Sequence, residues 1–314
     1  MIRYYGYRNG KFAETGAEAG SLLVELTGPS PEEIAALSAR YDISRKLLED
    51  VLDEDEVSRL SVRKEQITVY VDVPFTSRRA GRQRYRTLPA GFITGVTGNR
   101  LLTVTGRKLL PLDRTQAFLE ENGIDRELGP QELMLILLMQ VAGEYTGKLK
   151  KIVQDTAAIE EHMPNTMQNR EVMQLMEYKR GITGMEISLD AMRRVLDRMV
   201  LVNGMAAEPG RKSLLDELII ETEQAMEMAA IYSSDIRDLL EACHSVISNN
   251  LNVVMKILTA MTVILAIPTM IAGFFGMNVR LPMAGLPAAF WIIAGLSLVI
   301  SATAAVILIV RKLM

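Results

Sequence analysis

The sequence predicts a mixed α/β domain at the N-terminus, followed by long helices and two C-terminal transmembrane helices. Strand and helix signals alternate up to about residue 125, whereas the chain after Gly129-Pro130 is rich in Met, Leu, Glu, Gln and Lys. Near the C-terminus, two long runs carry no charged side chain. We therefore expect a cytoplasmic α/β domain at 1–128, a cytoplasmic long-helix or stalk region at 129–251 and a transmembrane domain at 252–314.

Composition narrows the possible classes of function. The 314 residues carry a net charge of −3 without an extended Lys/Arg run, so we expect no nucleic-acid partner. One cysteine, Cys243, and two histidines, His162 and His244, are too few for a disulfide framework or a thiolate or imidazole metal cage. No Gly-rich phosphate loop or nucleophile motif is present, so we expect neither an enzyme nor a cofactor. The N-terminus lacks the apolar core of a cleavable signal peptide.

The elements of the α/β domain have local signatures. The segment 30-SPEEIAALSARY-41 is typical of a helix, because Ser30 and Glu33 form a capping box and Pro31 occupies the first turn. Alternating apolar residues and β-branched side chains predict strands, and Gly98-Asn99 predicts a tight turn. The remaining expected elements are a strand in 21-SLLVELTG-28, a helix in 44-SRKLLEDVL-52, a strand in 66-QITVYVDVPF-75, and a hairpin formed by 90-AGFITGV-96 and 100-RLLTVTG-106.

Helical periodicity predicts two long helices at 131–163 and about 167–202. A third helical segment extends over 212–275. Pro268 is the only residue that interrupts its helical pattern, and a membrane helix tolerates a proline. About 64 residues at 1.5 Å per residue make a helix of about 95 Å, whereas a hydrocarbon core is about 30 Å thick. Much of this helix is therefore expected to project into the cytoplasm as a stalk.

Two transmembrane helices are predicted near 256–275 and 288–310. The nineteen residues from Ile257 to Phe275 and the thirty from Leu281 to Val310 carry no charge, and about 17 to 25 residues suffice to span a bilayer. The alternative is a buried helical hairpin in a soluble core, although buried helices seldom run this far without a charge.

The flanking cations predict how the two spans are oriented. Lys256 precedes the first span and Arg311-Lys312 follow the second, whereas Arg280 alone lies between them. The positive-inside rule then places both termini in the cytoplasm of a multi-pass protein of the cell membrane, with the connector at 276–287 outside.

One face of the first span carries small and weakly polar side chains. Arranged around an axis in an oligomer, this face would line a narrow channel whose cation ligands are neutral oxygens. Two alternatives stay open, since threonines in membrane helices often bond to their own helix or to a neighbour, and apolar side chains more often pack than gate. Steps of three or four residues connect the members of this line, which are Asn252, Met255, Leu258 or Thr259, Thr262, Ala266 and Thr269.

The run 252-NVVMKILTAMTVILAIPTMIAGFFGMN-278 resembles the first transmembrane helix of the CorA family of divalent-metal channels, including that family's Gly-Met-Asn signature. The two-span C-terminus, the long stalk and the segments 52-LDEDEVSRL-60 and 68-TVYVDVP-74 extend the resemblance over most of the chain. It implies a funnel-shaped homopentamer whose first spans line the pore while the second spans face membrane lipid. The implied substrate is hydrated Mg²⁺, a divalent cation that would also act as regulator.

The resemblance also implies that Gly276, Met277 and Asn278 form the selectivity filter at the outer mouth. Gly276 is expected to end the helix with a backbone conformation closed to other residues. Five Asn278 side-chain carbonyls would form a ring of neutral acceptors, which suits Mg²⁺ because this ion gives up its water reluctantly.

Further roles follow from the same resemblance. Asn252 matches a polar constriction on the cytoplasmic side of the pore, and Met255 and Leu258 match a hydrophobic gate. Family members sense intracellular Mg²⁺ at acidic sites between neighbouring cytoplasmic domains, and Asp216 or Glu217 falls near such a position by its spacing from Asn252. For either acid, the simpler interpretation is a solvated helix surface.

The sequence departs from the family pattern at the outer mouth. The connector 279–288 contains no carboxylate and one cation, Arg280, so it concentrates external cations weakly. Ala266 is small where bulkier residues are common, and the proline of the first span falls at Pro268. Mg²⁺, with Co²⁺ or Ni²⁺, is the first expectation for the substrate, and a zinc-transporting, proton-coupled branch is the alternative. An alternative of another class is a non-conducting membrane sensor or scaffold.

Overall fold

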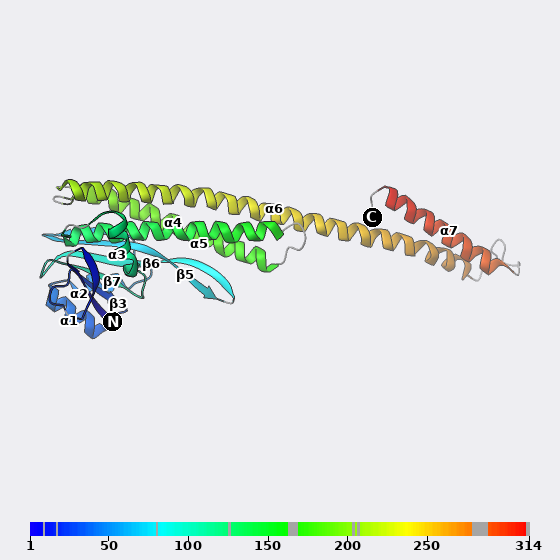
Figure 1. The fold of residues 1–314 in the computed structure, drawn as a ribbon. Helices are drawn as coiled ribbons and strands as arrows, with labels where there is room; N and C mark the ends of the chain where they lie inside the picture. The colour runs from blue at the N-terminus through cyan, green and yellow to red at the C-terminus, as the bar shows by residue number, and fades with distance from the viewer. Residues whose placement is uncertain are drawn as a thin grey trace. The chain divides into compact units, whose positions relative to one another are not determined.

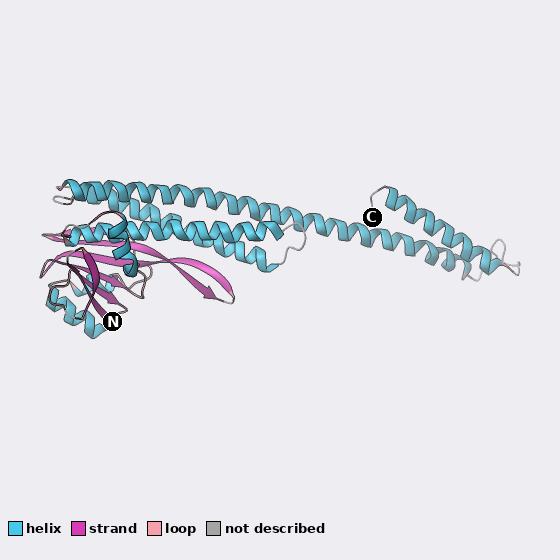
Figure 2. Ribbon diagram, viewed as in Figure 1, coloured by secondary structure: helices cyan, strands magenta, loops and turns pink. Residues whose placement is uncertain are grey.

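In the computed structural model, the chain forms two compact units, Met1–Leu240 and Glu241–Met314. Figures 1 and 2 trace the helices and strands of both units. The structure describes residues 1–8, 10–16, 18–79, 81–124, 127–162, 169–202, 205, 208–277 and 288–311.

A seven-stranded sheet forms the centre of the first unit (Figure 2). Strands β3 and β7 pair in parallel, and the other neighbouring strands pair antiparallel. The N-terminal hairpin is thereby joined to the rest of the sheet through β3. In spatial order the strands are β2 (Lys11–Thr15), β1 (Ile2–Arg8), β3 (Leu23–Thr27), β7 (Arg100–Thr105), β6 (Arg82–Val96), β5 (Gln66–Arg79) and β4 (Arg59–Arg63).

Two short helices, α1 (Pro31–Tyr41) and α2 (Arg45–Asp50), pack on one face of the sheet around a buried apolar cluster. The predicted capping box is present at the start of α1. The Ser30 hydroxyl accepts a hydrogen bond from the Glu33 amide at 3.2 Å, and the Glu33 carboxylate accepts one from the Ser30 amide at 2.9 Å. Local sequence therefore determines where this helix begins.

Long helices cover the other face of the sheet, where α5 packs on β6 and α4 on β5. The approach between α5 and β6 is close, because a Cβ atom at Gly181 would lie 2.9 Å from the Cβ of Tyr85. The helices lie close to the predicted ranges and are α4 (Pro130–His162), α5 (Asn169–Val200) and α6 (Pro209–Phe275), with the short η1 (Leu112–Arg114) and α3 (Thr115–Glu121) before them.

The sequence predicts a strand at 66–75 and a hairpin of 90–96 with 100–106, but no hairpin between β5 and β6. Strand β5 continues past Phe75 to Arg79 and β6 begins at Arg82, so these two strands form a long hairpin. Contacts with α5 stabilise this extension, which runs along the helices in Figure 1. The backbone of Gln83 exchanges two hydrogen bonds with the side chain of Gln174, at 3.3 and 2.9 Å. Strands β1, β2 and β4 were not predicted either, so the sheet is larger than the local signals indicate.

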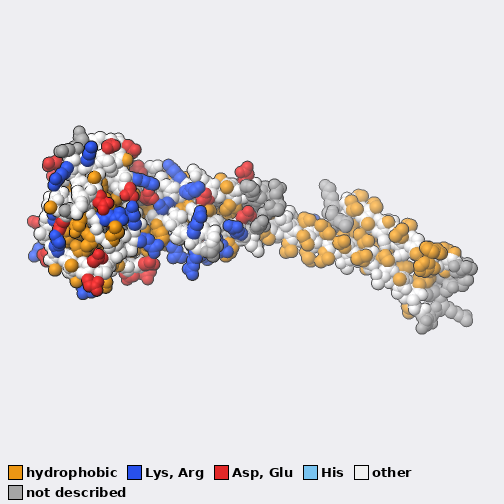
Figure 3. All heavy atoms as spheres, turned by 60° about the horizontal axis from the view of Figure 1, so that its bottom comes forward, with side chains coloured by type: hydrophobic (Ala, Val, Ile, Leu, Met, Phe, Trp, Pro, Cys, Tyr) orange, Lys and Arg blue, Asp and Glu red, His pale blue; other side chains and the backbone are white. Residues whose placement is uncertain are grey.

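The second unit contains the C-terminal part of α6 and helix α7 (Ala289–Val310), at the two predicted spans. Only 6% of the most apolar 18-residue window of α6 and 11% of that of α7 are buried. The face of these helices visible in Figure 3 is orange and white. This exposure argues against the alternative of a buried hairpin in a soluble core, since apolar helices of that length must then be covered by lipid or by other chains.

A partly buried carboxylate, that of Asp72, connects the sheet to the long helices of the first unit. The Ser188 hydroxyl of α5 donates to Asp72 Oδ2 at 2.6 Å and lies 3.0 Å from the Thr87 hydroxyl, and the Tyr145 hydroxyl of α4 donates to the Asp72 carbonyl at 2.9 Å. Among the described residues, no Lys or Arg forms an ion pair with Asp72. Burial raises the pKa of the Asp72 carboxyl, and the Ser188 hydrogen bond offsets part of that rise.

We predict that Asp72→Asn makes the first unit more stable than the wild type at neutral pH and that this gain disappears at acidic pH. Because the folded-state pKa is raised, the protonated carboxyl favours folding below the unfolded value of about 4, and this contribution is lost as pH rises through the folded pKa. Asn keeps a neutral acceptor and does not titrate. Hydrogen exchange of β5 and α5 peptides, measured on the full chain in detergent, should therefore show the variant gaining protection over wild type between pH 4 and pH 7.

The exposed Asp238 offers a matched control, since Asp238→Asn removes the same charge from the surface of α6. A difference between Asp72→Asn and wild type that stays constant across this pH range would contradict the prediction.

Candidate ion pathway

The side chains predicted to form the pore line are exposed along one face of α6 in the single chain. Met255 is 53% exposed and Leu258 is 57% exposed, and Asn252, Thr262 and the other members of the line fall in the same class. Exposed apolar and weakly polar side chains on a membrane helix need a covering partner other than α7. The line is therefore available to a neighbouring chain or to a water-filled path.

Helix α7 packs on the opposite face of α6. The less exposed positions of the span are Ala260, Ile264, Ile267, Pro268 and Ile271, which share one face. At 100° per residue, their mean direction lies about 180° from that of the predicted pore line. The packing of α7 thus leaves the whole predicted line free.

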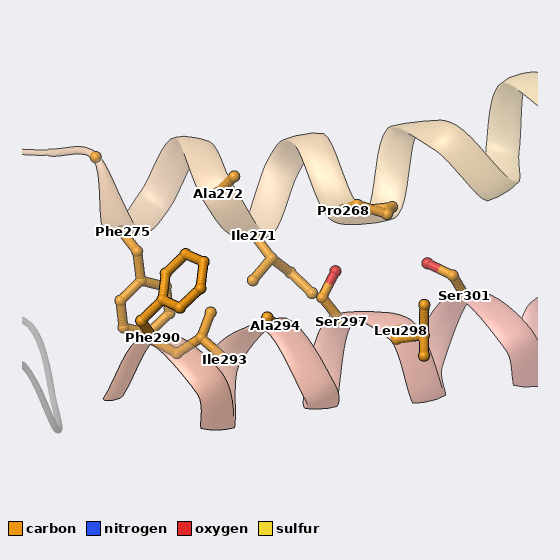
Figure 4. A pocket seen from close by; sticks show the side chains of 11 residues that line it. Pro268, Ile271, Ala272, Phe275, Phe290, Ile293, Ala294, Ser297, Leu298 and Ser301 are labelled. Atoms are coloured by element: carbon orange, nitrogen blue, oxygen red, sulfur yellow. The ribbon is translucent and has the colours of Figure 1, made fainter. Parts of the chain in front are cut away.

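The contact between α6 and α7 contains a cavity of about 540 Å³ (Figure 4). Phe275 lies beside Phe290, whereas Pro268 lies opposite Ser301, so the two helices run antiparallel. A proline within a helix leaves the carbonyl four residues earlier without its usual partner. The Ser301 hydroxyl, which is buried near Pro268, has no hydrogen-bond partner among the described residues. Small side chains and a proline therefore keep this contact loosely packed.

The threonines of the line donate to their own helix. The Thr262 hydroxyl bonds to the Leu258 carbonyl at 2.8 Å and the Thr269 hydroxyl to the Leu265 carbonyl at 2.9 Å, as one of the sequence-based alternatives expects. Thr303 of α7 does the same with Val299, so the geometry is not special to a pore. These hydrogen bonds do decide what the hydroxyls can bind. A hydroxyl that donates its proton to its own helix can only accept hydrogen bonds on its outward side.

The expected role of Gly276 in ending the helix is wrong. Gly276 has no positive φ angle, and a Cβ atom there would make ordinary contacts, at 3.4 Å from the Ala272 carbonyl and 3.5 Å from the Gly273 carbonyl. Its amide still donates to the Ala272 carbonyl at 2.9 Å, so the helical pattern continues to this residue. Among the described residues, nothing at this position requires a glycine.

Of the predicted filter, Gly276 and Met277 lie at the exposed end of α6, and Asn278 lies outside the described residues. The Met277 amide donates to the Phe274 carbonyl at 3.3 Å, which closes the last turn. Arg280, the one cation of the outer connector, also lies outside the described residues.

The line continues toward the N-terminus beyond the residues predicted from the sequence. Ser248, Ser245 and Glu241 follow Asn252 in steps of three or four, and all three are exposed. The Ser245 hydroxyl also donates backward, to the Glu241 carbonyl at 3.1 Å. The same periodicity that predicts the line could have identified these residues, and Glu241 is its first carboxylate.

The proposed regulatory acids, Asp216 and Glu217, are exposed on the part of α6 that belongs to the first unit. Within the described residues, no group of three or more His, Cys, Asp or Glu side chains is arranged to hold a metal ion. A metal site at Asp216 or Glu217 would therefore need ligands from outside the described residues of this chain.

A family model described as CorA-like Mg²⁺ transporter protein matches residues 18–312. The chain belongs to this CorA family. The cobalt/magnesium transport protein CorA of Methanocaldococcus jannaschii is 25% identical over 281 residues, which cover 88% of this chain and 86% of that protein. Membership identifies this CorA chain as a divalent-cation transport protein of the membrane.

Solved structures have a similar fold. The complete structure of the CorA magnesium transporter from Methanocaldococcus jannaschii has a TM-score of 0.76 at 22% identity, over 98% of this chain and 96% of that one. The full-length CmaX structure has a TM-score of 0.67 at 18% identity, over 100% of this chain and 97% of that one. The expected CorA fold, a sheet domain followed by long helices and two C-terminal apolar helices, is confirmed.

Proposed function

We propose that this CorA chain forms a homopentameric membrane channel that conducts hydrated Mg²⁺, with Co²⁺ or Ni²⁺ as further substrates. The observation that supports this most directly is the opposition of two faces on α6, one packed by α7 and the other exposed and carrying the predicted pore line. Five copies arranged around an axis would cover the exposed face of α6 and leave α7 on the lipid side.

The line suits an ion that keeps its water. Mg²⁺ dehydrates reluctantly, and the waters of its first shell donate hydrogen bonds. The outward lone pairs of Thr262 and Thr269 can accept those hydrogen bonds. From Asn252 to Met277 the chain has no carboxylate, so this stretch attracts a cation without holding it tightly.

We assign three zones to the pathway. Asn278, with Gly276 and Met277, forms the outer ring that binds the hydrated ion. Met255 and Leu258 form a hydrophobic gate near the cytoplasmic constriction at Asn252, where an apolar ring closes the pore by expelling water. Both chain termini lie in the cytoplasm, as the flanking cations indicate.

We predict that Asn278→Ala abolishes Mg²⁺ uptake while the protein still assembles. Loss of the acceptor ring removes the group that binds the hydrated ion. A decrease of about tenfold or more in the uptake rate corresponds to a rise of at least about 1.4 kcal/mol in the free-energy barrier to uptake. Uptake into dye-loaded proteoliposomes measures the effect, and Asn250→Ala, an exposed asparagine off the pore line, is the matched control.

The same vesicles distinguish the alternatives. Zn²⁺ uptake that depends on a pH gradient, without Mg²⁺ uptake, would replace the proposed substrate by that of a proton-coupled zinc transporter. If no divalent cation enters under any gradient, the channel proposal fails and a non-conducting scaffold takes its place.

We predict that Met255→Ala raises the basal flux. A smaller side chain widens the apolar constriction and makes it easier to wet, so leak at high internal Mg²⁺ should increase by about threefold or more. The control is Val254→Ala, because Val254 is exposed on the same turn but lies off the pore line. Equal flux in wild type and Met255→Ala would remove Met255 from the gate.

We predict that Glu217→Ala weakens closure by internal Mg²⁺. Glu217 and its neighbour Asp216 are proposed to bind a regulatory Mg²⁺ together with an adjacent chain, so removing one carboxylate should shift half-closure to a higher internal concentration. Flux measured over a range of internal Mg²⁺ tests this, with Glu227→Ala as an exposed control on the same helix. An unchanged midpoint would identify Glu217 as ordinary solvated surface.

A further inference from the structure

The first unit contains a cationic pocket that the transport pathway does not use. The pocket has a volume of about 430 Å³ and lies at the extended β5–β6 hairpin and the loop after β7. We call it the arginine pocket, because its lining includes five arginines. They are Arg78, Arg79, Arg84, Arg86 and Arg107.

The register of the hairpin concentrates these charges. Arg79 pairs with Arg82, Ser77 with Arg84, and Phe75 with Arg86, and paired residues point to the same face of a sheet. Arg79, Arg84 and Arg86 of the pocket therefore project from one face of the two strands, as does Arg82, which does not line the pocket. Arg78 starts from the opposite face. Two like charges directly opposite one another, as at Arg79 and Arg82, destabilise a hairpin, so the arrangement costs stability in the absence of an anion.

Nearby carboxylates neutralise only part of this charge. Glu177 of α5 pairs with Arg84 at 2.9 Å, and Glu54 lies 3.9 Å from Arg107. Across the described residues, no carboxylate lies within ion-pair distance of Arg79 or Arg86. The two acids that line the pocket, Glu54 and Asp55, are outnumbered by the arginines.

Two arginines are held in place by their surroundings. The Arg107 guanidinium lies 4.9 Å from the centre of the Phe75 ring, a cation–π contact that fixes it at the pocket. The Arg84 guanidinium is held by its ion pair with Glu177 at 2.9 Å. The pocket thus offers two positioned guanidinium groups as well as net positive charge.

We propose that the arginine pocket binds a polyphosphate anion, either the phosphate chain of a nucleoside triphosphate or inorganic tripolyphosphate. Planar guanidinium groups bind phosphate oxygens in pairs, and the Ser77 hydroxyl of the lining adds a neutral donor. Arg79 lies opposite residue 82, four residues from Arg86 along β6, so at about 3.3 Å per residue Arg79 and Arg86 of the lining lie about 13 Å apart along the hairpin, which suits a chain of phosphates better than one phosphate. The net charge of −3 and the two acids of the lining disfavour a nucleic acid.

The test is calorimetric titration of the full chain in detergent, with tripolyphosphate, ATP and adenosine, at low salt and in EDTA. Tripolyphosphate is expected to bind saturably, adenosine is not, and ATP distinguishes the two sources of the phosphate chain. If ATP binds too, the pocket accepts nucleotides; if tripolyphosphate alone binds, the ligand is the inorganic chain. Because no transport is measured, the result is independent of the proposed channel.

The double variant Arg79→Gln/Arg86→Gln should weaken tripolyphosphate binding at least about tenfold, since it removes two charges and their paired donors. The control is Arg45→Gln/Arg194→Gln, which removes the same charge from exposed helix positions and should leave affinity within about twofold. Far-UV circular dichroism checks that both double variants fold.

Three results would overturn the proposal. The first is the absence of saturable tripolyphosphate binding to the wild type. The second is equal weakening in the two double variants, which would indicate a response to net charge alone. The third is adenosine binding as tightly as ATP, which would place recognition on the nucleoside. Arg86→Lys separates charge from geometry, and affinity retained at the wild-type level would contradict paired guanidinium contacts.

Discussion

The packing of α7 against one side of α6 is the constraint on which the membrane part of this protein depends. A bilayer offers no water to satisfy polar groups, so each span must be helical and must hide its less apolar side chains against protein or in a water-filled space. Because α7 occupies the face of Ile264 and Ile271, no other described part of the chain covers the face of Thr262 and Thr269. A single chain is therefore incomplete in a membrane, which is the physical reason for proposing an oligomer.

Much of the architecture could be predicted, because its signals are local or periodic. The two spans follow from runs without charge, the long helices from a period of 3.6, and the start of α1 from the Ser30 and Glu33 capping box. The extension of β5 to Arg79 could not be predicted, since its residues are polar and its stability depends on α5 through Gln174 and Glu177. Tertiary contacts there override a weak strand signal.

The candidate site was predicted in part for the same reason. Helical spacing is enough to place the pore line on one face of α6. It does not determine which face of α6 contacts α7. The sequence also does not show whether the threonine hydroxyls bond to their own helix or to a neighbour. The hydrogen bonds from Thr262 to Leu258 and from Thr269 to Leu265 show that both donate to their own helix. At Gly276 the prediction was wrong. The general preference for a left-handed glycine after a helix predicted a positive φ angle there, and Gly276 does not have one.

The distribution of charge fits the transport of a hydrated cation. Carboxylates are absent between Asn252 and Met277, and the first acid along the line, Glu241, lies at its N-terminal end. A charged ring within the span would bind Mg²⁺ tightly and slow its release, whereas hydroxyl oxygens with free lone pairs hold only its water. Arginines gather elsewhere, on the β5–β6 hairpin, where they do not oppose a cation in the span. Weak neutral ligands inside and charged residues outside are the arrangement that lets an ion enter, stay hydrated and leave.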